Sequence, residues 1–328
     1  MGMLPPALRV ALERELTGTD QRRLAAAASG LSERYRAGHS RTTAPFVQNA
    51  ADVLAYAATR MPATLGAIKA ACAEIAQRQP NFQPQTQLDL GAGTGAATWA
   101  ASQTWSSLLQ HQLIERENTM LQLGQRLMQA GPTSLQQARW QQANLPNANA
   151  LGNYDLVTIG YVLGELNATQ RQQLLLQAWQ ASSGVLLIVE PGTPRGFELI
   201  LAARTFLLEQ QAHLIAPCPH QQTCPMQAND WCHFATRIER TRFHRSLKAA
   251  ELGYEDEKSS YIAVSRQSSQ LAQARVIRHP SQQPQRIQLQ LCTPQGLRSI
   301  TINKRDAQWK QARKAEWGDS FELNPTQD

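Results

Sequence analysis

The sequence has little charge and no long apolar run. Charged residues make up 17 % of the 328 residues, below the ~25 % usual for globular proteins. No apolar stretch approaches the ~18 residues of a membrane-spanning helix, so we expect no membrane partner. Hydrophobic residues still make up 42 %, which excludes bulk disorder. At ~150 residues per domain, the length predicts about two domains.

The N-terminus lacks the apolar core of a secretory signal peptide. Pro5 and Pro6, followed by charged residues from Arg9 onward, interrupt its apolar residues. We therefore expect a reducing location, the bacterial cytoplasm. In such a compartment, clustered cysteines indicate metal or redox chemistry more often than disulfides.

Positive charge is concentrated at the two ends of the chain. The formal net charge is +7. Residues 1–85 hold 10 Lys and Arg against 6 Asp and Glu, residues 241–328 hold 14 against 9, and the middle holds 8 against 10. Basic ends suggest a polyanionic partner such as RNA, although solvated helix faces explain such charges about as well. The candidate RNA-binding residues are Arg14, Arg22, Arg23, Arg34, Arg36, Lys304, Arg305, Lys310, Arg313 and Lys314.

Apolar periodicity divides the chain into segments of different kinds. It predicts helices over residues 6–28 and 46–78, with a polar loop at 31–40. From residue 87, short apolar runs alternate with helical stretches, which is the pattern of βαβ units around a parallel sheet. Strands are expected at 88–90, 112–114, 155–159, 185–189 and 261–266, and helices at 96–103, 119–129, 169–181 and 197–212.

These segments predict an α/β protein in three parts. An N-terminal helical region takes residues 1–85, a Rossmann-like domain takes 86–275, and a basic β-hairpin and tail take 276–328. The hairpin is expected to turn at Pro294-Gln295-Gly296. A segment rich in Pro, Cys and His, residues 213–240, is expected as an irregular insertion in the second part.

A glycine-rich turn from strand to helix reads LDLGAGTGAA. Gly91, Gly93 and Gly95 allow a ligand to approach the backbone closely, but their spacing also fits the dinucleotide fingerprint. Asp89 makes the turn resemble the first motif of class I S-adenosylmethionine (SAM) methyltransferases, in which this acid lies near the methionine amino group. Glu115, which ends the next strand, stands where these enzymes place a carboxylate that accepts both ribose hydroxyls. We expect these five residues to bind SAM.

Known catalytic signatures are missing. The segment YDLVTIGYVLGEL lacks the N/D-P-P-Y/F motif of amino-methylating enzymes. No cysteine lies between residues 73 and 217, where cytosine C5 methylation would need its nucleophile. Glu165 and Glu190 are candidates to face the SAM pocket, and termination of a strand is an equal alternative role for Glu190. The catalytic residues are unassigned at this point.

The cysteines cluster toward the C-terminus. Cys72 stands among alanines in an expected helix and is predicted to be buried. Ordering about twenty residues of the insertion costs roughly 20–40 kcal/mol, and a metal site worth about 10–16 kcal/mol would offset part of that. The other four cysteines are Cys218, Cys224, Cys232 and Cys292. Their spacing contains neither the C-x2-C pairs of common zinc modules nor the C-x3-C-x2-C triad of radical SAM enzymes. The metal site could hold an iron–sulfur cluster or zinc, and His220 and His233 are alternatives to Cys292 as the fourth ligand.

Several segments together resemble the methyltransferase-like family associated with the small ribosomal subunit of bacteria and mitochondria. The resemblance implies a SAM-type Rossmann-like domain, a [4Fe–4S] cluster and a role in small-subunit assembly on rRNA. The matching segments are AYAATRMPAT, LDLGAGTG, GYVLGEL, VEPGTPRGFE, APCPHQQTCP with DWCHF, GYEDEKSSYIAVSR and RDAQWKQARKAEWGD. The cluster ligands implied by the resemblance are Cys218, Cys224, Cys232 and Cys292, with zinc as the alternative metal.

The leading interpretation is a SAM-dependent methyltransferase-like protein that acts, as a monomer, on small-subunit rRNA or its precursor. The first alternative is a non-catalytic assembly factor that keeps SAM and the cluster. The second is a small-molecule methyltransferase, which would have no need of basic ends.

Overall fold

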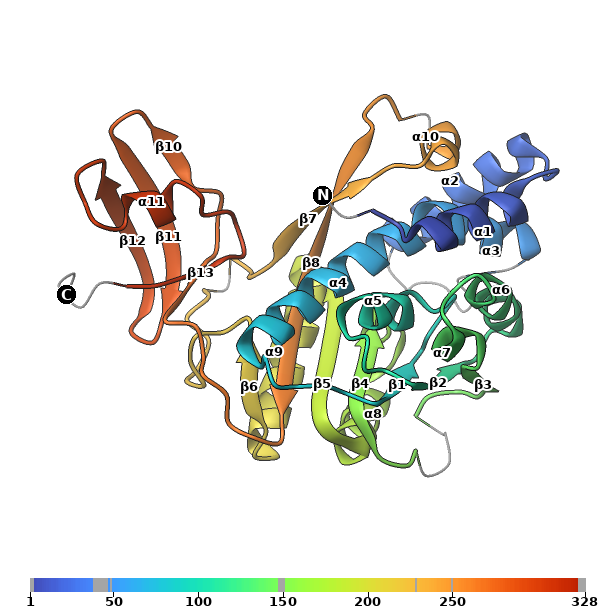
Figure 1. The fold of residues 1–328 in the computed structure, drawn as a ribbon, viewed down its shortest axis with the longest axis horizontal. Coiled ribbons are helices and arrows are strands. Elements are labelled where there is room, and N and C mark those ends of the chain that lie inside the picture. Colours follow the sequence, from blue (N-terminus) through green and yellow to red (C-terminus); the bar gives the residue numbers. More distant parts are fainter. Residues whose placement is uncertain are drawn as a thin grey trace.

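A computed structural model describes residues 3–37, 47, 49–146, 151–227, 229–248 and 250–323. Within these residues, an eight-stranded sheet forms the centre of the molecule, and a second sheet of five strands lies at one end of its long axis (Figure 1). Four N-terminal helices precede the central sheet. None of the helices described here is both long and apolar enough to cross a membrane.

The N-terminal helices differ from the sequence prediction at three places. The single helix predicted over 46–78 is divided at Arg60 into α3 and α4, and a proline follows in the first turn of α4. The predicted helix over 6–28 is interrupted, because the chain is extended at Thr17 and Gly18 adopts a φ of +82°. The predicted loop at 31–40 is wrong over most of its length: the second helix continues to Ala37, since Leu31 is buried in the core. The four helices are α1 (Pro6–Leu16), α2 (Gln21–Ala37), α3 (Ala50–Thr59) and α4 (Met61–Arg78).

The central sheet has the strand order β3-β2-β1-β4-β5-β8-β6, with β7 paired to β8. Neighbours from β3 to β5 are parallel, whereas β8 runs antiparallel to both β5 and β6. This is the class I SAM methyltransferase arrangement, so the predicted Rossmann-like α/β fold is confirmed. The strands are β1 (Thr86–Leu90), β2 (Gln110–Glu115), β3 (Arg139–Gln142), β4 (Tyr154–Gly160), β5 (Ser182–Pro191), β6 (His213–Ala216), β7 (Phe234–Glu239) and β8 (Tyr254–Ser265).

Helices cover both faces of the central sheet (Figure 1). Alternate residues of β5 show the two layers: Leu187 packs with the cluster that includes α4 and α5, and Leu186 with the cluster of α8 and α9. Burial on both faces is why this strand reads as a continuous apolar run. The helices after β1 are α5 (Ala96–Thr104), α6 (Asn118–Met128), α7 (Thr133–Gln136), the 3-10 turn η2 (Leu163–Glu165), α8 (Ala168–Ala181), α9 (Pro194–Glu209) and α10 (Arg242–Leu247).

The C-terminal part forms a sheet with the order β10-β11-β9-β13 and with β12 paired to β11. The predicted hairpin is confirmed. Its antiparallel strands are β11 and β12, and Thr293 pairs with Gly296 at the turn. Buried residues such as Leu289 alternate with exposed ones such as Gln290 along β11, so one face carries the core. Its elements are β9 (Ala274–Val276), β10 (Ser281–Gln283), β11 (Arg286–Thr293), β12 (Gly296–Asn303), α11 (Trp309–Ala312) and β13 (Ser320–Phe321).

Candidate functional site

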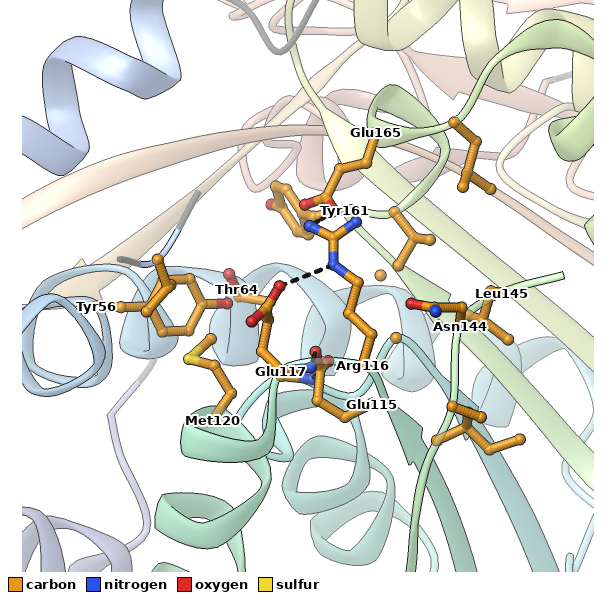
Figure 2. Close-up of a pocket in the computed structure, with 18 of the residues that line it drawn as sticks. Tyr56, Thr64, Glu115, Arg116, Glu117, Met120, Asn144, Leu145, Tyr161 and Glu165 are labelled. Carbon is orange, nitrogen blue, oxygen red and sulfur yellow. Dashed lines mark hydrogen bonds and ion pairs between the residues drawn. The ribbon is translucent and has the colours of Figure 1, made fainter. Parts of the chain in front are cut away.

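A cavity of about 370 Å³ opens at the carboxyl ends of β1, β2 and β4 (Figure 2). The strand order reverses between β1 and β4, and such a switch point is where open α/β sheets bind ligands. The volume lies within the range of small-molecule sites, about 300–1,000 Å³. The walls come from the glycine-rich turn, the end of β2, the segment after β4, and the helices α3 and α4.

Two of the three glycines line this cavity. Gly91 and Gly93 have φ values of +74° and +57°, which side chains rarely adopt. A Cβ on Gly91 would also lie 2.3 Å from a methyl group of Val162. Gly95 does not line the cavity: a Cβ there would lie 2.4 Å from the terminal methyl of Met128, so this glycine lets α6 approach the turn.

Glu115 connects the ends of β1 and β2 at the cavity wall. Its side chain is buried, with one oxygen accepting from the Gly93 amide (2.7 Å) and the other from the Glu117 amide (2.8 Å). Burial raises the pKa of this carboxyl, and the two amides oppose the rise. An ionised carboxylate offers about four acceptor positions, so Glu115 keeps capacity for a ligand diol.

Asp89 lies beneath the glycine-rich turn and does not line the cavity. Only 1 % of it is exposed. Its two oxygens accept from the hydroxyls of Thr98 (2.8 Å) and Thr158 (2.9 Å). Burial raises its pKa to about 6, although both hydroxyls act to lower it. The structure therefore gathers Gly91, Gly93 and Glu115 around the cavity, and places Asp89 as a support that joins β1 to α5 and β4.

Charged residues that the sequence analysis did not select surround the mouth of the cavity. Arg116 lies 3.1 Å from Glu117 and 3.1 Å from Glu165, linking the end of β2 to the segment after β4. Glu165 lines the cavity, as expected. The place of Arg116 directly after a predicted ligand residue is the only sequence signal that could have identified it.

Tyr161, immediately after β4, is a second residue that the sequence analysis missed. It lines the cavity with a φ of +62°, an unusual conformation for a bulky residue. Its hydroxyl donates to Glu257 on β8 (3.1 Å). Strained backbone of this kind is concentrated at functional sites. The sequence placed Tyr161 where amino-methylating enzymes have their catalytic motif, but its backbone geometry is visible only in the structure.

The N-terminal helices also contribute to the wall. Tyr56 on α3 and Thr64 on α4 line the cavity together with Arg60. Burial raises the pKa of Tyr56 to about 12, so this residue is a neutral hydroxyl at physiological pH. The N-terminal helical region is therefore part of the site.

Glu190 supports the site from behind. Its side chain is 1 % exposed and accepts from the Leu163 amide (2.8 Å), and it does not line the cavity. Burial raises its pKa to about 7, although the amides of Val162, Leu163 and Gly164 act to lower it. Glu190 thus fixes the backbone turn after β4.

The segment 213–240, predicted to be irregular, begins and ends with strands β6 and β7, so the irregular insertion is limited to residues 217–233. A second cavity lies between this insertion, α9, β8 and the C-terminal sheet. His220 lines it, with Nε2 3.6 Å from the Cys292 sulfur. His233 lies outside it and stacks on Trp231, with ring centroids 5.2 Å apart. Cys72 is fully buried in α4, as predicted. The cysteines that line this cavity are Cys218, Cys224, Cys232 and Cys292.

The four cysteines share one cavity without forming a closed ligand set. Among the described residues, no group of three His, Cys, Asp or Glu side chains is placed so that it could hold a metal ion.

The predicted basic residues lie at opposite ends of the long axis, on α1 and α2 and on the C-terminal sheet (Figure 1). Arg34 is ion-paired with Asp52 at 2.8 Å. The side chain of Arg36 lies outside the described residues. The exposed members are Arg14, Arg22, Arg23, Lys304, Arg305, Lys310, Arg313 and Lys314.

Curated relatives of the chain include two mitochondrial proteins. It is 29 % identical over 286 residues to the human protein named ribosome assembly protein METTL17, mitochondrial, covering 81 % of this chain and 61 % of that protein. It is 26 % identical over 220 residues to Rsm22-cox11 tandem protein 2, mitochondrial, of Schizosaccharomyces pombe, covering 52 % and 29 %. The chain thus spans less than two thirds of the length of these relatives.

Similar solved structures include a methyltransferase and a protein of an O-methyltransferase family. Magnesium protoporphyrin IX methyltransferase from Synechocystis, with bound SAH, has a TM-score of 0.42 at 13 % identity over 72 % of this chain and 94 % of that one. An O-methyltransferase family protein from Burkholderia thailandensis has a TM-score of 0.43 at 13 % identity over 67 % and 61 %.

The family comparison covers most of the chain. Residues 50–322 match the family described as mitochondrial small ribosomal subunit Rsm22. This range includes the glycine-rich turn, the segment after β4, the cysteine insertion and the whole C-terminal sheet. The chain therefore belongs to the Rsm22 family.

Proposed function

We propose that this protein acts on small-subunit rRNA or its precursor during ribosome assembly, and that it binds SAM and a metal cluster. Family membership and the name of the human relative, a ribosome assembly protein, support this role. The observation that carries the RNA part of the proposal is a group of basic side chains on the C-terminal sheet.

We call this group the C-terminal basic surface. All of its side chains are exposed, and within the described residues none forms an ion pair. Some exposed arginines elsewhere are paired, for example Arg126 with Glu15 and Arg237 with Asp256, whereas the exposed Arg22 and Arg23 of α2 form no ion pair among the described residues. Uncompensated cations on one surface suit the phosphates of RNA. Its members are Arg286, Lys304, Arg305, Lys310, Arg313 and Lys314.

Salt dependence of RNA binding tests this assignment. Phosphate contacts release counterions, so log K should fall with log salt by about 0.7 to 0.9 per phosphate neutralised. A variant in which the five basic residues between positions 304 and 314 are all replaced by Gln should bind RNA more weakly and show a flatter salt dependence, while its SAM affinity stays the same. A control variant with three paired arginines changed, Arg126, Arg195 and Arg237 to Gln, should keep the slope. Equal slopes in the two variants would show that RNA binds elsewhere.

The first cavity supports SAM as the cofactor. Glu115 offers acceptor positions for a ribose diol, and the left-handed turn at Gly91 and Gly93 leaves room for a ligand against the backbone. Bound SAM would supply an electrophilic methyl group. Isothermal calorimetry with SAM and with NAD tests the cofactor, and preferential binding of NAD would contradict the proposal.

The second cavity supports a metal group held by thiolates, for which we propose a [4Fe–4S] cluster with zinc as the alternative. Four cysteine side chains line it. Protein purified without oxygen should be brown and contain nearly equal iron and acid-labile sulfide, and Cys72→Ser should keep the colour. Stoichiometric zinc without sulfide, in protein made with iron available, would establish zinc as the metal.

Methyl transfer to rRNA is the second candidate function. The open cavity favours it, but the nearby carboxylates are engaged: Glu115 by amides, Glu165 by Arg116 and Glu190 by the turn after β4. Transfer of a labelled methyl group from SAM to purified small subunits or precursors would establish the enzyme. Its absence, together with steep salt dependence of RNA binding, would favour the non-catalytic assembly factor. Labelling of small metabolites alone would favour the small-molecule alternative.

We also propose that the protein is a monomer in the bacterial cytoplasm. Cell fractionation and light scattering test the two parts of this statement.

A further inference from the structure

Arg204 on α9 is a buried cation that has no carboxylate partner in the described part of the chain. Its exposed fraction is 5 %. Its Nη2 donates to the backbone oxygens of His220 (3.0 Å) and Gln222 (2.7 Å), whereas its buried Nε makes no hydrogen bond among these residues. A buried charge without a counter-ion is costly. An anion in the cavity that Arg204 lines would therefore stabilise its buried guanidinium group.

The groups that can supply this anion are the cysteine thiols. Arg204 lines the same cavity as the four cysteines. Arg275, the other buried arginine of this cavity, forms an ion pair with Glu74 at 2.6 Å, and Glu74 also pairs with Arg78. Arg204 is thus the buried arginine of this cavity that has no carboxylate partner among the described residues.

His220 brings a second N–H group to the thiols. It is 7 % exposed, and its Nε2 lies 3.6 Å from the Cys292 sulfur, a distance at which N–H donates to sulfur. Arg204 holds the backbone oxygen of the same residue. Arg204 on α9 thus braces the loop that carries His220, and both side chains lie beside thiols that come from two parts of the fold, the insertion and β11.

Resting on the proposed metal cluster, we propose that Arg204 and His220 stabilise its negative charge. Arg204 balances charge beside Cys218, and His220 donates its Nε2–H to the Cys292 thiolate. Both are positioning residues and not ligands. Reduction adds negative charge to a cluster, so a nearby cation and a hydrogen bond to sulfur both raise its reduction potential.

Four variants test this role in the full chain. At a fixed potential near the wild-type midpoint, the ratio of reduced to oxidised cluster should fall about tenfold in Arg204→Gln, which corresponds to about 59 mV for one electron. His220→Phe should shift the ratio in the same direction. His220→Gln, which keeps an N–H at a similar position, should restore it. Arg195→Gln, an exposed change on the same helix, should behave like wild type.

Metal retention against a chelator gives a second readout that does not depend on redox activity. Arg204→Gln and His220→Phe should lose metal faster than His220→Gln and Arg195→Gln, whether the metal is iron or zinc. Wild-type protein that binds neither metal would refute the metal centre and with it this role. Loaded wild-type protein whose potential and retention are unchanged in both Arg204→Gln and His220→Phe would refute only the role of these two residues. His220→Phe keeps the test valid if Arg204→Gln fails to fold.

Discussion

At the scale of single residues, two acids of the SAM motif have different tasks. Glu115 lines the cavity and shares its oxygens with two amides, whereas Asp89 is enclosed by two threonine hydroxyls. Both acids were predicted to contact the cofactor, because the spacing of a motif indicates where along the chain a residue stands and does not indicate the direction of its side chain. Which way a side chain points depends on Thr98 and Thr158, whose partners no motif identifies.

Glu115→Ala should weaken SAM binding by about 1–3 kcal/mol, because the ribose diol loses a buried acceptor. Part of the loss comes from the Gly93 and Glu117 amides, which lose their partner and loosen the turn. Calorimetry of SAM or S-adenosylhomocysteine measures it, with the exposed change Glu198→Gln as control. Unchanged affinity would remove Glu115 from the binding site.

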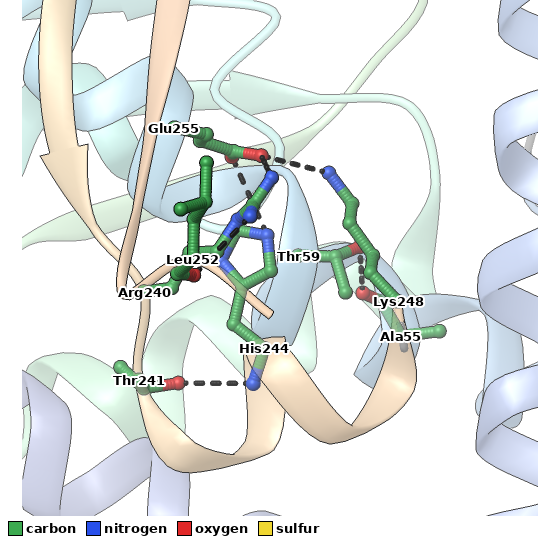
Figure 3. Close-up of polar contacts among 8 residues, drawn as sticks. All are labelled: Ala55, Thr59, Arg240, Thr241, His244, Lys248, Leu252 and Glu255. Atoms are coloured by element: carbon green, nitrogen blue, oxygen red, sulfur yellow. Dashed lines mark hydrogen bonds and ion pairs between the residues drawn. The ribbon is translucent and has the colours of Figure 1, made fainter. Parts of the chain in front are cut away.

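Glu255 at the start of β8 is the centre of a charged cluster between α10 and the N-terminal helices (Figure 3). Its oxygens lie 3.1 Å from Arg240, 3.2 Å from Lys248 and 3.3 Å from the buried His244. Burial raises the pKa of Glu255, but these three partners outweigh burial and bring it down to about 2. Its ionised form therefore stabilises the fold.

Glu255→Gln should lower the free energy of unfolding at pH 7 by about 2–3 kcal/mol. Because the folded pKa is lowered, the stabilisation is fully present above the unfolded pKa near 4.5 and is lost as the pH falls toward 2. The difference between wild type and variant should therefore be constant from pH 7 to 5 and shrink below that range. Urea unfolding at several pH values measures it; a difference that grows on acidification would contradict the assignment.

At the scale of elements, the sequence predicted best where burial leaves a periodic signal. The strands β1, β2, β4 and β5 and the helices between them were expected because both faces of the sheet are covered. The break at Thr17 and Gly18 was missed, since apolar residues continue across it in helical spacing. The extension of α2 was missed because Leu31 is followed by polar residues that read as a loop.

Short strands were also missed. β9 and β13 are three and two residues long, and they pair with partners distant in the sequence. Such pairing leaves no local pattern, so only the hairpin of β11 and β12 was predictable. The gathering of four cysteines at one cavity was expected from the family resemblance, whereas the buried Arg204 among them was not.

Gly91→Ala should disrupt the glycine-rich turn. The added Cβ would meet Val162 at 2.3 Å, in a backbone conformation of φ +74° that alanine adopts poorly. We expect a stability loss of about 1–3 kcal/mol and weaker SAM binding. Gly253→Ala is the matched control, because nothing lies within 4 Å of its added Cβ and its φ is not positive. Equal effects of the two changes on SAM affinity would show that the turn tolerates a side chain.

At the scale of the whole molecule, the second cavity, which the four cysteines line, lies where two parts of the fold meet. Three of its thiols come from the insertion between β6 and β7, and Cys292 comes from β11 in the C-terminal sheet. Arg275 on β9 adds a second connection, since it donates to Pro217 of the insertion and to Gly318 near β13. A metal group at this joint would fix the sheet that carries the C-terminal basic surface relative to the SAM domain.

Cys292→Ser should therefore affect RNA binding more than SAM binding. Loss of one thiolate weakens metal binding, and the C-terminal sheet then keeps only its protein contacts to the rest of the molecule. Hydrogen exchange should become faster in β9 and β11 and stay unchanged in β1 and β4, and RNA affinity should fall because the basic surface is no longer held in one orientation. Cys72→Ser, remote from the joint, should change neither RNA affinity nor exchange in the sheet. If Cys292→Ser loses its metal but keeps RNA affinity and the exchange pattern of the sheet, the protein contacts alone hold the two parts together.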